Sequence, residues 1–536
     1  MFWLSVFLFS GTSTFSQSFQ WVKQLGNEEW DEVIDIETDE NDNVYCIGTF
    51  EGTVDFDPGP EIYNLTSSEG SQNAFLTKFD AAGSFQWAKL LAGEGWVEVN
   101  DLHLDDLGNI YITGSFLGTI DFDPSDSTFE LVSGGSIHAF ICKLDTAGNL
   151  DWATNTGGSL AVNSFAVTTD SEGNVYSTGY FDGTADLDPG DGTFQMTVMG
   201  YSDAFVRKLD SSGNFIWVKQ LGGSQGSVGH SIGVDSNGNV YTTGTFATTV
   251  DFDPGEDTFI LESEDEQSMY LSKLDSSGSF QWAKNMGGDV GYSLIVDQSD
   301  DIYVTGYYGW DDIFINKLNP VGNLLWEKQI GAFVCYSLEV DEQGNIYTIG
   351  QFYETGDFNP GPDVYELTAI GSSDSYINML DSSGNFMWVK QIGGTDEVLS
   401  RSLAMDSNGA LLTAGTFNGT ADFDPGPATS ELTSSGSYDI FLQKLEPSGV
   451  SVSENSFSKD VKVYPNPTDG KVTVEFTEMQ AELDIIVTNS VGQIVKTESM
   501  KRGTRTEFQI KGASGVYFLE ILNQDKQNAI FRVLKN

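Results

Sequence analysis

The run SIGVDSNGNVYTTGTF, residues 231–246, contains the pattern that decides the fold. Apolar and polar residues alternate on both sides of a central DSNGN run at 235–239. Such alternation, enriched in Val, Ile, Tyr and Phe, predicts β-strands. The central run suits a type I turn followed by a glycine in the left-handed region. We therefore predict a tight antiparallel hairpin.

This hairpin belongs to a unit that occurs seven times. Its second strand recurs as an aromatic-rich segment that starts at residues 43, 109, 174, 239, 301, 345 and 410. A third segment of the type Phe-Leu-x-Lys-Leu-Asp starts at 75, 140, 205, 270, 314, 376 and 441. A fourth segment of the type Phe-x-Trp is marked by Trp21, Trp87, Trp152, Trp217, Trp282, Trp326 and Trp388. A similar Asp-x-x-Gly turn joins the third segment to the fourth, so each unit predicts two hairpins.

Four antiparallel strands repeated seven times predict an all-β fold, a seven-bladed β-propeller. A solenoid is the alternative, but a solenoid needs capping repeats, and the sequence shows none. The N-terminal strand Phe19 to Lys23 has the pattern of a fourth strand, whereas the last unit ends at its third strand, Phe441 to Leu445. We expect the N-terminal strand to complete the last blade, which would remove two exposed sheet edges.

The unit resembles the bacterial β-propeller repeat family known as SBBP through the shared pattern Asp-x-x-Gly-Asn-x-Tyr-x-x-Gly. The resemblance extends over residues 19–446 and implies the propeller fold. It implies no fixed activity, because propellers carry many unrelated functions.

The charge distribution indicates a domain boundary near residue 455. The chain has 25 basic and 79 acidic residues and a net charge of −54. Residues 460–536 contain ten of each, so the rest of the chain carries the whole net charge. We predict the propeller over 17–447, a Ser-rich linker over 448–459 and a small Ig-like β-sandwich over 460–536. So acidic a chain is unsuited to nucleic-acid phosphates or anionic lipids.

Both ends of the chain carry export signals. YPNP at 464–467, NSVG at 489–492 and GVYF at 515–518 resemble the type A C-terminal sorting domain of the type IX (Por) secretion system. The resemblance implies export, interaction of residues 460–536 with the secretion machinery, and release or attachment at the outer-membrane surface. The apolar run Phe2 to Phe9 predicts a signal peptide over residues 1–16 and is too short to span a bilayer.

The run Asp-Phe-Asp-Pro-Gly, or a close variant, joins the second and third strands in six units. The predicted chain path places these acidic loops on one face. Hard cations prefer carboxylate and carbonyl oxygens, so such a face is a candidate Ca²⁺ site. Asp followed by Pro and Gly also suits an ordinary type II turn, and both interpretations stay open. The candidate ligands are Asp55, Asp57, Asp121, Asp123, Asp186, Asp188, Asp251, Asp253, Asp422 and Asp424.

Unit five lacks this loop, and only Gly309-Trp310-Asp311 joins its second and third strands. We expect a notch there, lined by Tyr307, Tyr308 and Trp310. Aromatic faces at such a rim can stack on sugar rings. The alternative is an ordinary deletion whose aromatics pack on the neighbouring blade.

The sequence contains no recognisable catalytic motif. His103, His138 and His230 have no partners at metal-ligand spacing, and no nucleophile elbow or phosphate loop occurs. The many carboxylates follow the repeat, and we expect none that breaks it. We therefore expect a binding or adhesion protein for a glycan or protein ligand, and not an enzyme. The alternatives are a polysaccharide-active hydrolase or lyase and a structural surface scaffold.

Overall fold

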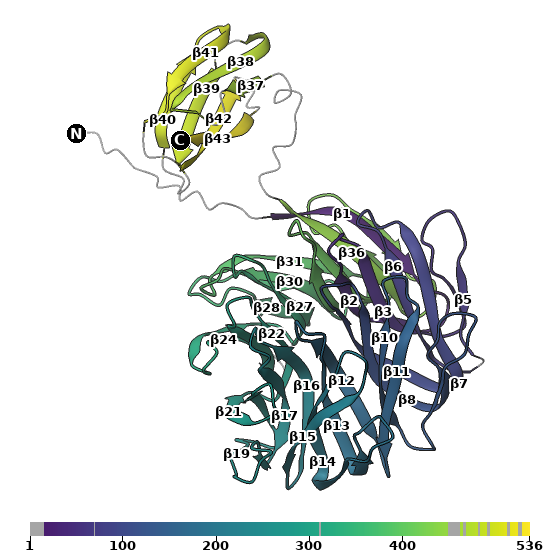
Figure 1. The fold of residues 1–536 in the computed structure, drawn as a ribbon. Helices are drawn as coiled ribbons and strands as arrows, with labels where there is room; N and C mark the ends of the chain where they lie inside the picture. Colours follow the sequence, from purple (N-terminus) through teal and green to yellow (C-terminus); the bar gives the residue numbers. More distant parts are fainter. Residues whose placement is uncertain are drawn as a thin grey trace. The chain divides into compact units, whose positions relative to one another are not determined.

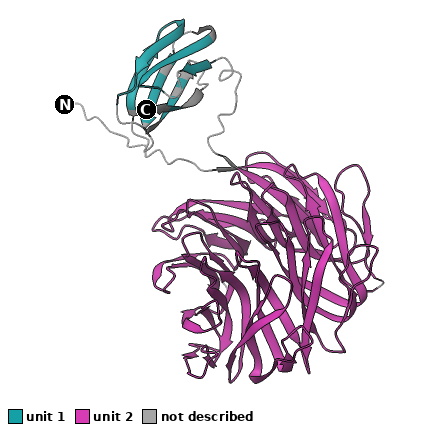
Figure 2. Ribbon diagram, viewed as in Figure 1, with its two compact units in different colours: residues 1–16, 448–536 teal, residues 17–447 magenta. Residues whose placement is uncertain are grey.

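The computed structural model describes residues 16–448 except 69, 310 and 311, and residues 461–535 except 465–467, 481–482, 490–493, 512–514 and 524–527. The described residues form strands and no helix, so this part of the chain is all-β, as predicted. None of them therefore belongs to a helix that could cross a membrane. The chain divides into two compact units, residues 17–447 and residues 1–16 together with 448–536 (Figure 2). The predicted signal peptide lies outside the described residues, apart from Ser16.

The larger unit consists of antiparallel strands that pair in sets of four (Figure 1). Set one is β2 (Asp31–Thr38), β3 (Val44–Phe50), β6 (Asn73–Phe79) and the first half of β7 (Phe85–Leu104). The second half of β7 begins set two, followed by β8 (Ile110–Asp121), β10 (His138–Leu144) and β11 (Leu150–Gly158). Set three is β12 (Val162–Thr169), β13 (Val175–Asp186), β14 (Gln195–Leu209) and β15 (Phe215–Gly223).

The remaining sets follow the same order. Set four is β16 (Gly226–Val234), β17 (Val240–Ala247), β20 (Ser268–Leu274) and β21 (Phe280–Gly287). Set five is β22 (Val290–Val296), β23 (Ile302–Tyr308), β24 (Asp312–Leu318) and β25 (Leu324–Ile330). Set six is β26 (Val334–Val340), β27 (Ile346–Phe352), β30 (Asp374–Leu380) and β31 (Phe386–Gly394). Set seven is β32 (Val398–Met405), β33 (Leu411–Phe417), β36 (Asp439–Ser448) and β1 (Ser16–Leu25).

Strand β1 pairs with β36, so the N-terminal residues complete the last set, as predicted. The first strands of successive sets lie against one another, and β32 of set seven lies against β2 of set one. Buried side chains of neighbouring sets pack together; one hydrophobic cluster, for example, joins Phe50 and Phe75 of set one to Leu412 and Leu442 of set seven. The first strands of all seven described sets therefore surround a common centre.

Short strands occupy the connections between the second and third strands of a set. They are β4 (Thr53–Asp55), β5 (Asn64–Thr66), β9 (Glu130–Val132), β18 (Thr249–Asp251), β19 (Ile260–Glu262), β28 (Thr355–Asp357), β29 (Glu366–Thr368), β34 (Thr420–Asp422) and β35 (Glu431–Thr433). Several connections also pair with the fourth strand of the preceding set, as Asp251 does with Gly222. These connections therefore help to join neighbouring sets.

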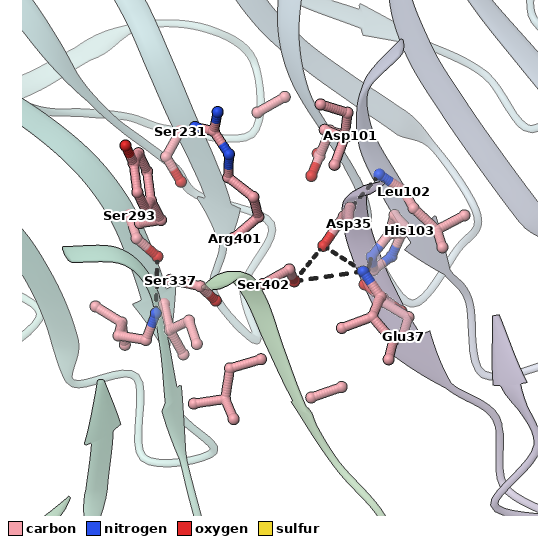
Figure 3. A pocket seen from close by; sticks show the side chains of 18 of the residues that line it. Asp35, Glu37, Asp101, Leu102, His103, Ser231, Ser293, Ser337, Arg401 and Ser402 are labelled. Carbon is pink, nitrogen blue, oxygen red and sulfur yellow. Dashed lines mark hydrogen bonds and ion pairs between the residues drawn. The ribbon is translucent and has the colours of Figure 1, made fainter. Parts of the chain in front are cut away.

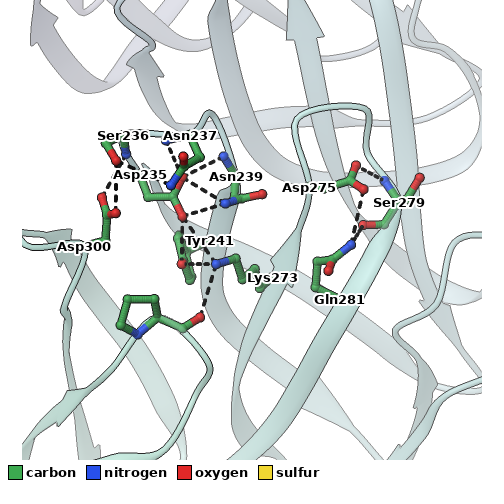
Figure 4. A network of polar contacts seen from close by, with 11 residues as sticks. Asp235, Ser236, Asn237, Asn239, Tyr241, Lys273, Asp275, Ser279, Gln281 and Asp300 are labelled. Atoms are coloured by element: carbon green, nitrogen blue, oxygen red, sulfur yellow. Dashed lines mark hydrogen bonds and ion pairs between the residues drawn. The ribbon is translucent and has the colours of Figure 1, made fainter.

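The aspartate of each Asp-x-x-Gly-Asn turn organises its hairpin. In set four, Asp235 Oδ1 accepts hydrogen bonds of 2.9 Å from the backbone N–H groups of Asn237 and Asn239. Tyr241 donates its hydroxyl to Asp235 Oδ2 at 3.0 Å, and Lys273 Nζ lies 3.3 Å from the same oxygen (Figure 4). Burial alone would raise the pKa of Asp235, but the side-chain amide of Asn239 together with these hydrogen bonds lowers it. The network explains why Asp, Asn, Tyr and Lys recur together in the repeat.

The smaller unit contains two antiparallel sheets. One sheet is β37 (Val461–Tyr464), β38 (Lys471–Gln480) and β41 (Gly503–Gln509). The other is β40 (Ile494–Met500), β39 (Leu483–Asn489), β42 (Gly515–Asn523) and β43 (Asn528–Lys535). Buried residues of both sheets, among them Val474 and Ile485, belong to one hydrophobic cluster.

Candidate functional site

A central cavity of about 490 Å³ lies inside the ring of first strands. Residues from β2, β7, β12, β16, β22, β26 and β32 line it, so all seven sets contribute to its wall (Figure 3). A cavity surrounded by every repeat is where chemically distinct residues of different repeats can meet.

Each first strand contains a β-bulge at the same place, where one extra residue interrupts the pairing with the second strand. A bulge re-aims side chains and leaves the extra residue outside the regular ladder. The seven bulge residues all line the central cavity, and they are Ile34, Asn100, Phe165, His230, Tyr292, Tyr336 and Arg401. These equivalent positions carry six different residue types, so the repeat does not dictate their identity.

Four consecutive bulge residues form an aromatic arc. Phe165 and His230 stack with ring centroids 5.5 Å apart and planes 21° apart. Tyr292 continues the arc, 6.1 Å from His230 and 5.9 Å from Tyr336 between ring centroids. Burial lowers the pKa of His230 to about 4, so its imidazole is neutral at physiological pH. The arc is therefore an uncharged aromatic surface.

Arg401 ends this arc with a positive charge. Its guanidinium carbon lies 4.7 Å from the ring centroid of Tyr336, and Nη2 is 2.8 Å from Glu32 Oε1. Both contacts hold the guanidinium against the wall of the cavity.

The residue after each bulge connects one set to the next. Ser231, Ser293 and Ser402 each accept, through Oγ, the backbone N–H of a residue in the first strand of the following set. In sets one and two this residue is Asp35 and Asp101 instead. Asp35 Oδ2 accepts the N–H of Leu102 at 2.9 Å, and Asp101 Oδ2 that of Val167 at 2.6 Å. The expectation that no carboxylate breaks the repeat is therefore wrong.

These two carboxyl groups are strongly perturbed. Burial, and then the charge of Glu37, raise the pKa of Asp35 to about 6. Burial and the charge of Asp35 raise the pKa of Asp101 well above its usual range. Two adjacent carboxyl groups cannot both ionise cheaply, so the pair shares a proton near neutral pH.

Two further acidic groups lie in the wall. Glu37 Oε1 is 3.5 Å from Nδ1 of His103. Burial would lower the pKa of His103, but the hydrogen bond and charge of Glu37 raise it. In β26 of set six, burial raises the pKa of Glu339 to about 8, and the charge of Glu37 adds to this effect. The wall of the cavity thus contains the aromatic arc and, in addition, acidic groups whose pKa values are raised.

The short connection of set five adjoins a smaller pocket of about 210 Å³. Tyr307 lines this pocket and stacks on Tyr292, with ring centroids 5.8 Å apart and planes 27° apart. Tyr292 and Tyr336 line both this pocket and the central cavity. Tyr308 instead packs on Phe314, at a centroid distance of 4.9 Å, and Trp310 lies outside the described residues.

The acidic loops are built alike. Asp55 Oδ1 accepts the backbone N–H groups of Asp57 and Tyr63, and Asp57 Oδ1 accepts that of Gly59. The same three bonds recur at Asp121 with Asp123, Asp186 with Asp188, Asp251 with Asp253, Asp357 with Asn359, and Asp422 with Asp424. The residue between the two acceptors, such as Phe56, is fully buried. This bonding favours the turn interpretation.

Among the described residues, no three His, Cys, Asp or Glu side chains form a group that could hold a metal ion. The candidate calcium ligands Asp55 to Asp424 therefore stay a prediction from sequence, without a three-ligand cluster in the described structure.

Aligning the first strands on their turn aspartates would have found Asp35 and Asp101. Four sets have serine at that position, namely Ser231, Ser293, Ser337 and Ser402, and set three has Ala166. The bulge residues are harder to find, because the extra residue disrupts the alternation from which a strand's buried face is inferred.

Comparison with known families first defines the class of protein. Residues 216–252 match the family model described as a beta-propeller repeat, so the larger unit contains a β-propeller repeat of this class. Residues 462–535 match the secretion system C-terminal sorting domain. The chain is thus a β-propeller repeat protein with a type IX sorting domain, and this domain indicates export to the cell surface or medium.

Individual relatives are distant. An uncharacterized WD repeat-containing protein of Acanthamoeba polyphaga mimivirus is 27% identical over 247 residues, which cover 40% of this chain and 18% of that protein. The Dos1 propeller is 9% identical, with a TM-score of 0.40, over 80% of this chain and 95% of its own. The C-terminal WD40 domain of Sif2 is 10% identical, with a TM-score of 0.37, over 80% and 100%.

Proposed function

We propose that residues 17–447 form a closed seven-bladed propeller and that residues 460–536 form an Ig-like sandwich, joined by a linker over 448–459. The pairing of β1 with β36 supports the closed ring, as does the cyclic contact of the first strands from β2 to β32. The two sheets around one cluster support the sandwich. Residues 460–536 address the chain to the type IX machinery, and an N-terminal signal peptide precedes the propeller.

The propeller is a secreted or surface-attached binding protein whose ligand site is the central cavity with its adjoining pocket. The observation that carries this proposal is the set of bulge residues. The seven equivalent positions carry six different residue types, a variety that a purely structural ring would not need. A ligand site in a repeat protein has to differ from blade to blade, because a single ligand is not sevenfold symmetric.

A glycan is the ligand that the lining favours. Tyr292, Tyr307 and Tyr336 present aromatic faces on which the apolar face of a sugar ring can stack. Arg401, Asn100 and the acidic residues of the opposite wall supply hydrogen-bond donors and acceptors for hydroxyl groups. Mixed aromatic and polar linings of this kind bind small ligands and chain ends.

A glycan array probed with the whole secreted chain tests this proposal. We expect binding to a defined glycan class and a loss of at least about tenfold in affinity for Tyr292→Ala, because a stacking surface is removed. Tyr308→Ala is the matched control, since Tyr308 packs on Phe314 and is not part of either lining. If no glycan binds, or if both variants lose the same affinity, the result would favour the scaffold alternative. Including Ca²⁺ and chelator in parallel shows whether a cation assists binding.

The hydrolase alternative is supported by one observation, the repeat-breaking pair Asp35 and Asp101. Retaining glycosidases hold their two carboxyl groups about 5 Å apart, and inverting enzymes hold theirs farther apart. The charge of Asp35 acts directly on Asp101, and each carboxyl group is already engaged by a backbone N–H of the next set. This geometry favours binding over hydrolysis. Release of reducing ends from a bound polysaccharide, abolished by Asp101→Asn, would establish the enzyme instead.

A further inference from the structure

Three sets place a buried aspartate two residues before the central aromatic residue of their third strand: Asp203, Asp374 and Asp439. Each carboxylate lies against a glycine of the adjacent fourth strand, where a side chain would collide with it. Each also accepts the side-chain amide of a glutamine from that strand, Gln220, Gln391 or Gln24. The three sites are thus built to one plan.

In two of these sites both carboxylate oxygens have partners. Asp203 Oδ1 accepts the N–H of Gly223 at 3.2 Å, and Asp374 Oδ1 accepts that of Gly371 at 3.4 Å. At Asp439, where β1 joins set seven, the arrangement differs. Asn27 occupies the position equivalent to Gly223, but its backbone N–H donates to Asp31 Oδ2, at 2.7 Å. Asp439 Oδ1 consequently has no hydrogen-bond partner among the described residues.

Asp31 is itself a break in the repeat. Sets two, three and seven have valine at the equivalent position, namely Val97, Val162 and Val398, whereas set five shares the aspartate, as Asp289. Asp31 is fully buried, and its Oδ1 atom also has no hydrogen-bond partner within the described part of the chain. Its backbone N–H donates to Tyr438 O at 3.2 Å, so Asp31 and Asp439 come from directly adjacent backbone.

The place where the ring closes therefore holds two buried carboxylates, each with one oxygen that has no hydrogen-bond partner among the described residues. A buried ionised carboxylate is costly unless a charge partner is present. Burial, and among other effects the charge of Asp439, raise the pKa of Asp31 to about 7. A water molecule would donate hydrogen bonds but would leave the charge in place. A cation would both bind the unpartnered oxygens and compensate the buried negative charge.

We propose that a divalent cation, with Ca²⁺ as the probe, binds between Asp31 and Asp439 and fastens the N-terminal strand to the last set. Carboxylate oxygens are the ligands that Ca²⁺ prefers. Two carboxylates are few for a dedicated Ca²⁺ cage, so we expect a dissociation constant of about 10⁻⁴ to 10⁻³ M, the range of extracellular modules. This site is separate from the acidic loops and from the ligand cavity.

Terbium luminescence provides a direct test, because Tb³⁺ replaces Ca²⁺ and accepts energy from nearby indole rings. Trp30 precedes Asp31, and its ring centroid is 4.6 Å from that of Tyr438, beside Asp439. In the whole chain we expect Tb³⁺ emission on excitation of tryptophan, displaced by excess Ca²⁺. Asp31→Val, which inserts the residue found in three other sets, should abolish this emission. Asp31→Asn, which preserves the side-chain shape, should weaken it strongly.

Thermal unfolding gives the second readout. Ca²⁺ should raise the unfolding temperature of the wild-type chain relative to chelator, and this shift should vanish in Asp31→Val. Asp253→Asn is the control and should keep the shift, because Asn359 already has the equivalent loop position in set six. Equal shifts in wild type and Asp31→Val, or no shift in the wild type, would overturn the proposal. A wild-type stability that responds to pH near 7 but not to Ca²⁺ would show a shared proton in place of the cation.

Discussion

The carboxyl group of Asp35 lies close enough to that of Asp101 for its charge to raise the pKa of Asp101, although each group also accepts a backbone N–H of the following strand set. Each group has a folded-state pKa above the value of about 3.9 expected in the unfolded chain. The folded protein therefore retains protons that the unfolded chain releases. It follows that the contribution of the pair to stability falls as the pH rises from about 4 through the folded-state pKa values.

Asp101→Ser should remove most of this pH dependence, since three other sets use serine at this position to accept the same kind of N–H. We expect the wild type to lose about 2 kcal/mol more than the variant between pH 5 and pH 8. Denaturant unfolding at both pH values measures the difference. Parallel pH profiles for the two proteins would contradict the proton-sharing interpretation.

Asp251→Ala should lower the free energy of unfolding by about 1–3 kcal/mol, because the N–H groups of Asp253 and Phe259 lose their acceptor. If the loop has only this turn role, the loss is the same in Ca²⁺ and in chelator. Chemical denaturation under both conditions checks the prediction. A loss that appears only in Ca²⁺ would instead support a cation at the acidic loops.

Phe252→Leu should cost less than about 1.5 kcal/mol, whereas Phe252→Ala should cost about 3–5 kcal/mol. Phe252 is fully buried, with ring centroids 5.5 Å from Phe246 and 4.8 Å from Tyr270. Leu187 occupies the same loop position in set three and shows that leucine fits there. Similar losses in both variants would mean that the ring contacts, and not the buried volume, hold the loop.

Lys273→Met should destabilise the protein by about 1–3 kcal/mol, because Asp235 and Tyr241 lose a buried charged donor. The reverse change, Met379→Lys, supplies set six with the lysine that the other six sets have, and it should be neutral or stabilising. Thermal unfolding of both variants at pH 7 measures these changes in stability. A stabilising Lys273→Met would show that the lysine serves a purpose other than stability.

The strands, their order and the closing role of β1 could be predicted because each rests on local chemistry that recurs. The Asp235 turn and the Trp217 strand repeat so often that alternation and turn residues define them. The cavity lining could not be predicted in the same way. His230 and Tyr292 occupy bulges, and an extra residue shifts the alternation that assigns a side chain to a face.

Contacts between residues that are far apart in the sequence could not be predicted either. Asp31 and Asp439 are separated by almost the whole larger unit, and nothing in either local sequence shows that they meet. Asp35 and Asp101 were visible in principle as departures from serine, but only after the first strands had been aligned on Asp39 and Asp105. Of the aromatic residues predicted at the set-five notch, Tyr307 lines the pocket, whereas Tyr308 packs on Phe314 and does not line it.

The pairing of β1 with β36 has a consequence for the folding of the larger unit. Gln24 donates a hydrogen bond to Asp439 across 415 positions of the chain, so this contact closes a very long loop, which costs more chain entropy than the hairpins within a set. A chain interrupted before β36 leaves β1 without its neighbour and its apolar side chains in water. The last set can therefore be completed only after the chain has been synthesised through β36, whereas the smaller unit is not needed for this step.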